Sequence, residues 1–100
     1  MLKKRFFKTK DECEVTFQFD GAEAETAAVV CEANNWQPVA MKKQKSGDFV
    51  TKLRLPVEGQ FQFRYLVDGD LWLNDDSADA YWPNQFGEKN SVVFTGRNGS

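Results

Sequence analysis

The chain has 100 residues, which is the usual size of one domain and too short for two separate hydrophobic cores. Its formal net charge is −2, from 13 Lys and Arg against 15 Asp and Glu, so no basic field favours nucleic acid or anionic lipid as a partner. No apolar run approaches the roughly 18 to 20 residues that span a bilayer. The N-terminal segment 1–5, with three basic residues, is not followed by the apolar run of a signal peptide. We therefore expect a cytoplasmic protein that binds neither nucleic acid nor membrane.

The first predicted strands are segments 12–19 and 25–32. Apolar residues alternate in the first segment, as in a strand with one buried face, and form a nearly continuous run in the second, as in a central strand. We expect these segments to form an antiparallel hairpin in which Cys13 lies opposite Cys31. The interpretation that we favour is two reduced, buried thiols, with a disulfide as the alternative. A metal site is not expected, because two Cys without any His leave a ligand set incomplete.

Three further segments, Phe49–Leu55, Phe61–Val67 and Ser91–Thr95, have the composition of strands. Gly, Pro and Asp residues separate the predicted strands where the chain has to reverse. Several short strands at this spacing, without a helical segment, predict an all-β antiparallel β-sandwich. We assign residues 1–96 to this single domain and expect 97–100 to be a flexible tail.

Segment 75–89 departs from the strand pattern. It is rich in Asp and Asn, yet it carries Tyr81, Trp82 and Phe86. We predict a loop without regular structure. Because loops of this length are uncommon and often functional, this segment is the first place to look for a site.

Aromatic residues are unusually frequent, with nine Phe, three Trp and two Tyr, so we expect some of them on the surface. Trp36 follows the turn-forming pair Asn34-Asn35 and is poorly placed for the core. It is interpreted either as a lid folded over the sandwich edge or as a platform on which a sugar ring stacks, since pyranose C–H groups pack on a flat indole.

Four other side chains fit a sugar site. Trp72 follows a predicted turn, and Arg64 is expected on the polar face of the preceding strand, where it is either a solvated charge or a donor to sugar hydroxyls. Asn90 offers a donor and an acceptor at the start of the last strand. Phe86, beside a glycine, offers an apolar wall.

Four stretches in this order, NNW at 34–36, FRYLVDG at 63–69, Trp72 and NQFGEKNSVV at 84–93, resemble the glycogen-binding family. That family includes the early-set domains of isoamylases and glycogen branching enzymes and the glycogen-binding module of the AMP-activated kinase β subunit. The lysine-rich N-terminal strand and the length are similar to its small stand-alone bacterial members. The resemblance implies an immunoglobulin-like sandwich of the early-set type that binds α-1,4-linked glucan (glycogen, starch or maltodextrin) without catalysis or cofactor.

The resemblance also implies which residues contact the glucan. Asn35 precedes the first platform residue, and Trp82, without a counterpart in the family's site, either enlarges the platform or caps the sandwich edge. Ala33 stands where the family usually has an aromatic residue, which implies looser packing beneath the first tryptophan. The contact residues carried over are Trp36, Arg64, Trp72, Phe86 and Asn90.

Catalysis is not expected. The cluster Asp75, Asp76 and Asp79 supplies carboxylates, but glycoside hydrolysis needs two of them across a cleft that excludes water, and we interpret these three as solvated loop charges. The chain has no His and no phosphate-binding Gly-rich loop. The alternative function is a protein-interaction domain that docks on a glycogen-metabolising enzyme.

Overall fold

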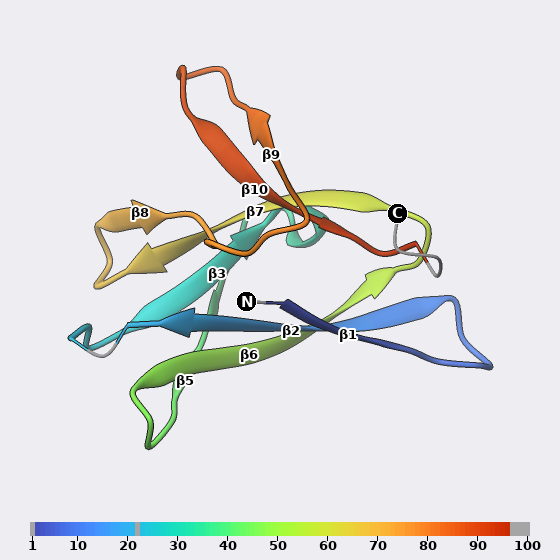
Figure 1. The fold of residues 1–100 in the computed structure, drawn as a ribbon, viewed down its shortest axis with the longest axis horizontal. Helices are drawn as coiled ribbons and strands as arrows, with labels where there is room; N and C mark the ends of the chain where they lie inside the picture. The colour runs from blue at the N-terminus through green and yellow to red at the C-terminus, as the bar shows by residue number, and fades with distance from the viewer. Residues whose placement is uncertain (1, 22, 97–100) are drawn as a thin grey trace.

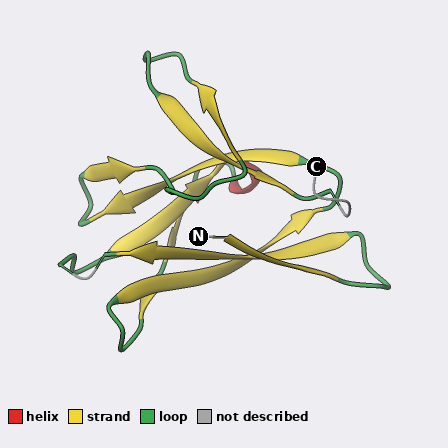
Figure 2. Cartoon of the chain, in the orientation of Figure 1, coloured by secondary structure: helices red, strands yellow, loops and turns green. Residues whose placement is uncertain are grey.

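The computed structural model describes residues 2–21 and 23–96, and the predicted tail at 97–100 lies outside this part of the chain. Antiparallel strands form two sheets that pack face to face, as predicted (Figures 1 and 2). Sheet A has the strand order β1-β2-β6-β5, and sheet B the order β4-β3-β7-β10-β9, with β8 paired to β7. A single 3-10 turn, η1, follows β3 in the described part of the chain. The elements are β1 Leu2–Phe6, β2 Glu12–Asp20, β3 Ala27–Cys31, η1 Glu32–Asn34, β4 Pro38–Ala40, β5 Lys42–Lys43, β6 Asp48–Pro56, β7 Gln60–Val67, β8 Leu71–Leu73, β9 Ala80–Pro83 and β10 Lys89–Phe94.

The core lies between the two sheets and is built by the alternation seen in the sequence. Phe17 of β2 and Phe63 and Tyr65 of β7 are each 0% exposed, and the rings of Phe17 and Phe63 meet edge to face across the sandwich with centroids 5.0 Å apart. Burying each such ring stabilises the fold by roughly 1.5–3 kcal/mol. Because alternate residues point to opposite faces of a strand, Arg64, between Phe63 and Tyr65, points away from this core.

The predicted hairpin between segments 12–19 and 25–32 is wrong. Strand β2 pairs with β1 and β6, whereas β3 pairs with β4 and β7, so the chain changes sheets between them. The carboxylate of Asp68 accepts the backbone N–H groups of Glu25 and Thr26 at 2.8 and 3.0 Å, which ties the start of β3 to the end of β7. Cys13 and Cys31 therefore do not face each other as strand partners. Both are buried, as expected, and the structure shows no bond between them.

The prediction that segment 75–89 lacks regular structure is also wrong in part. Residues Ala80–Pro83 form β9, which pairs with β10 and makes a hairpin that projects from the sandwich (Figure 1). Strand β10 pairs with the first half of β7, and β8 pairs with its second half along the same edge. Asn74 lies at this fork: its Nδ2 donates to the Lys89 carbonyl at 2.8 Å, and its Oδ1 accepts the Ser91 N–H at 2.9 Å.

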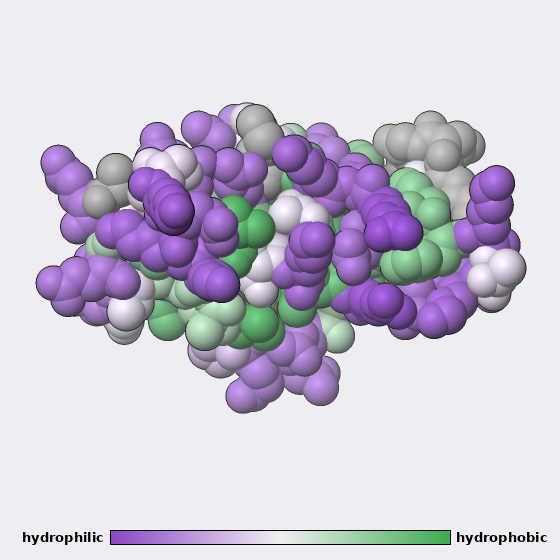
Figure 3. Space-filling view, turned by 90° about the horizontal axis from the view of Figure 1, so that it is seen from below, coloured by the Kyte–Doolittle hydropathy of each residue, from purple (hydrophilic) through white to green (hydrophobic). Residues whose placement is uncertain are grey.

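Charged side chains join the sheets and cover sheet A. Lys4, on an edge strand, forms an ion pair with Asp79 at 2.6 Å, and an inward-pointing charge of this kind protects an edge from pairing with another chain. Asp79 is exposed, as expected, and the structure adds Lys4 as its ion-pair partner. The side of the molecule that carries β5 and β6 is mostly hydrophilic (Figure 3). No helix in the described residues is long and apolar enough to cross a membrane.

Candidate functional site

The outer face of sheet B carries a hollow of about 820 Å³, a volume within the range of small-ligand sites. Register places the hollow on this face, because Val30 is the cross-strand partner of Arg64 and both line it. The hollow brings together side chains from η1, β7, β8 and the β9–β10 hairpin. Five residues predicted from the sequence line it: Trp36, Arg64, Trp72, Phe86 and Asn90.

The backbone after β3 turns Trp36 outward. Asn35 and Trp36 both have left-handed φ values, 55° and 59°, and the Trp36 N–H donates to the Cys31 carbonyl at 2.9 Å. Asn tolerates this conformation, whereas a bulky residue without glycine's freedom adopts it at a cost of about 1–2 kcal/mol. The turn leaves the indole 42% exposed at the edge of the hollow. Asn35 itself does not line the hollow, so the structure gives it the role of shaping the turn.

Arg64 lies between Trp72 and the β9–β10 hairpin. Its guanidinium carbon is 5.9 Å from the centroid of the Trp72 ring, within the distance of a cation–π contact, and its Nη2 donates to Glu88 Oε2 at 3.2 Å. Its Nε is buried and has no hydrogen-bond partner among the described residues. Trp72 remains 45% exposed, so the centre of the hollow offers an open indole beside a guanidinium.

Asn90 is more enclosed than the sequence suggests. It is 9% exposed; its Nδ2 donates to Gln62 Oε1 at 3.0 Å, and its Oδ1 accepts Asn84 Nδ2 at 3.2 Å. Because an amide group has two donors and two acceptor lone pairs, Asn90 retains capacity for a ligand while it orients its neighbours. Gln62 also lines the hollow, and the candidate residues chosen from the sequence omit it. Its position two residues before Arg64 on the outward face of β7 is the signal that identifies it.

Asn84 gives the hairpin loop its shape. Its Oδ1 accepts the backbone N–H groups of Phe86 and Glu88 at 2.9 and 3.1 Å, and Gly87 supplies the left-handed φ of 78° that closes the loop. Phe86 is held outward and is 78% exposed. A side-chain oxygen that bonds N–H groups two and four residues ahead is typical of Asn at a turn, so the sequence carries a signal for this residue too.

Trp82 lies on the same face but outside the hollow. It is the cross-strand partner of Asn90, and partners across a ladder point to the same side of a sheet. Its side chain is half-buried and does not line the hollow. The geometry therefore places Trp82 next to the site without making it part of the wall.

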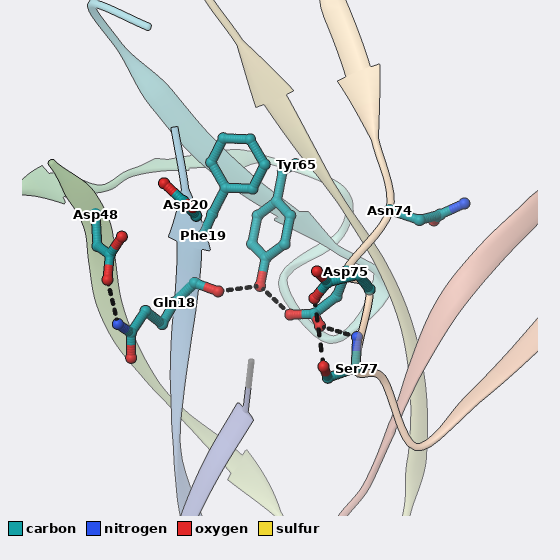
Figure 4. A pocket seen from close by; sticks show the side chains of 9 residues that line it. Gln18, Phe19, Asp20, Asp48, Tyr65, Asn74, Asp75 and Ser77 are labelled. Carbon is teal, nitrogen blue, oxygen red and sulfur yellow. Dashed lines mark hydrogen bonds between the residues drawn. The ribbon is translucent and has the colours of Figure 1, made fainter. Parts of the chain in front are cut away.

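A second hollow of about 360 Å³ lies where β2 and β6 approach residues 74–77 (Figure 4). Asp75 is 2% exposed and accepts the Tyr65 hydroxyl at 2.6 Å and the Ser77 N–H at 2.7 Å. Burial and this bond both raise the pKa of Tyr65. Asp75 is thus a buried structural acceptor, and the interpretation of it as a solvated charge is wrong. No group of three or more potential metal-ligating side chains occurs among residues 2–21 and 23–96.

An antiparallel β-sandwich with exposed aromatic side chains around an open, polar-lined hollow has the features of a ligand-binding domain. Residues 13–97 match the family model described as the glycogen recognition site of AMP-activated protein kinase. The chain therefore belongs to this family of carbohydrate-binding modules, whose members bind glucan and are not enzymes. No curated protein matches the chain.

Proposed function

We propose that the chain binds α-1,4-linked glucan in the hollow on sheet B, with Trp36 and Trp72 as stacking platforms. The observation that carries the proposal is the convergence of both exposed indoles with Arg64 in one hollow, from segments up to 36 residues apart in the sequence (36 to 72). Glucose rings present C–H groups on their faces and hydroxyls at their edges. Indole faces suit the former, and guanidinium and amide groups suit the latter.

The other lining residues have complementary roles in this proposal. Phe86, at the tip of the hairpin, provides an apolar wall, and Asn90 and Gln62 hydrogen-bond sugar hydroxyls at the floor. The hollow is open to solvent and its lining recognises glucose units, so glycogen, starch and maltodextrin all fit the chemistry. Trp82 extends the platform only for a chain that runs along the β9–β10 hairpin.

Native gel electrophoresis with and without glycogen tests the proposal. We expect glycogen to retard the wild-type protein and Trp36→Ala to lose more than about tenfold in affinity, because aromatic residues at the centre of small interfaces often contribute 2 kcal/mol or more. Leu71→Ala is the matched control, since Leu71 is 52% exposed on β8 but does not line the hollow. A wild-type protein that glycogen does not retard would refute glucan binding and favour docking on a glycogen-metabolising enzyme.

A further inference from the structure

Glu88 reaches into the hollow from the β9–β10 hairpin and meets Arg64. Both backbone groups of Glu88 are held by Asn84: its N–H donates to Asn84 Oδ1 at 3.1 Å, and its carbonyl accepts the Asn84 N–H at 2.8 Å. The side chain is 61% exposed, and the Arg64 side chain is 19% exposed. The hairpin thus fixes the Glu88 backbone while the carboxylate remains free to move toward solvent.

The contact between the two side chains is incomplete. Nε–H and one Nη2–H of a guanidinium point along the same edge, so a carboxylate can accept both in a bidentate pair. Glu88 makes only the Nη2 contact, at 3.2 Å, and Nε is left buried without an acceptor in the described structure. Because a buried donor without a partner is unfavourable, the Arg64–Glu88 contact stabilises Arg64 only weakly. A ligand that supplies an acceptor for Nε can therefore replace Glu88.

We propose that Glu88 is an internal competitor for Arg64, which glucan binding displaces. This inference rests on the proposed glucan function of the hollow. In the free protein the carboxylate neutralises the guanidinium, and in the complex neutral sugar hydroxyls take its place while Glu88 swings into solvent. Glu88 then influences the glucan affinity without contacting the sugar. It also makes the binding of an uncharged ligand depend on salt, because salt screens the Arg64–Glu88 ion pair that binding has to break.

Calorimetric titration with maltoheptaose tests this role. Glu88→Gln removes the charge and keeps the shape of the side chain, and we expect it to bind roughly two- to fivefold more tightly than wild type, the range that exposed ion pairs contribute. Glu88→Ala is expected to gain at least as much. The matched control is Glu12→Gln, which removes the carboxylate of another exposed pair, Arg54–Glu12 at 3.7 Å on sheet A, and leaves the hollow unchanged.

Salt gives a second, independent readout. Raising NaCl is expected to strengthen maltoheptaose binding by wild type and by Glu12→Gln but to leave Glu88→Gln unaffected. Equal or weaker binding by both Glu88 variants, beside a wild type that binds, would overturn the inference and make Glu88 a bystander or a direct acceptor of sugar hydroxyls. Absence of binding by wild type and all variants would instead refute the proposed function.

Discussion

Asp75 provides a sharp test of how the sandwich is held together. Its carboxylate is 2% exposed and accepts the hydroxyl of Tyr65, itself fully buried, at 2.6 Å. In Asp75→Ala the Tyr65 hydroxyl loses its strong acceptor, because its other acceptor in the described structure, the Gln18 carbonyl, is 3.5 Å away. A hydrogen bond to a charged group is worth about 1.5–3 kcal/mol.

The expected loss of unfolding free energy is about 2 kcal/mol, since water can replace the bond from the Ser77 N–H but not the one from Tyr65. For a domain of this size, each 1 kcal/mol shifts the melting temperature by about 4–8 °C. We therefore expect Asp75→Ala to melt roughly 10 °C below wild type in a thermal unfolding experiment followed by circular dichroism.

Asp76→Ala is the matched control, because Asp76 is exposed and accepts only the Ser77 hydroxyl, at 3.3 Å, among the hydrogen bonds described for it. We expect its melting temperature to stay within a few degrees of wild type. If the two alanine variants melted at the same temperature, the Asp75–Tyr65 bond would have no stabilising role and the reasoning would be refuted.

Two further predictions concern the hairpin and the core. Asn84→Ala is expected to lower glucan affinity about tenfold, because the Phe86 and Glu88 N–H groups lose their acceptor. Asn84→Asp keeps an acceptor oxygen at this position and is expected to retain most of the affinity. Titration calorimetry compares the two variants, and equal affinities would contradict the prediction. Burial raises the pKa of Cys31 from 9.0 to about 11, so its stabilising contribution is present below pH 9.0 and is lost as the pH rises toward 11. Urea unfolding across this range is expected to show a decrease of about 2–3 kcal/mol in the free energy of unfolding that comes from Cys31. Cys31→Ala is expected to abolish this decrease. If the variant kept the pH profile of wild type, Cys31 would not be its source.

Local alternation made much of the fold predictable. The inward positions of Phe63 and Tyr65 and the outward position of Arg64 follow from the period of a strand alone. The hairpin error has a different origin, because a turn signal shows that the chain reverses but not which sheet receives the next strand. Contacts with distant residues accompany that choice: Asp68, more than 40 residues later in the sequence, accepts the N–H groups of Glu25 and Thr26 at the start of β3.

The site was predictable to the extent that single side chains reveal their chemistry. Trp36 and Trp72 are exposed, as expected, and they line one hollow with Arg64. The contacts between these side chains could not be predicted in the same way. Glu88 bonds Arg64, and Asp75 bonds Tyr65, across 24 and 10 positions of sequence that the fold brings together. An acidic residue in a polar segment is usually solvated, and only the approach of a buried hydroxyl makes Asp75 an exception.

The fork at which β8 and β10 share one edge of β7 has a practical consequence for protein engineering. The β9–β10 hairpin leaves the sandwich there, and Asn74 clamps its base through Lys89 and Ser91. The loop side chains Gln85, Phe86 and Glu88 can therefore be exchanged, because they line the hollow and none of them belongs to the hydrophobic core. A library confined to Gln85, Phe86 and Glu88 would vary ligand preference on a constant scaffold, with Asn84 and Gly87 kept to hold the loop and Trp36 and Trp72 kept as aromatic anchors.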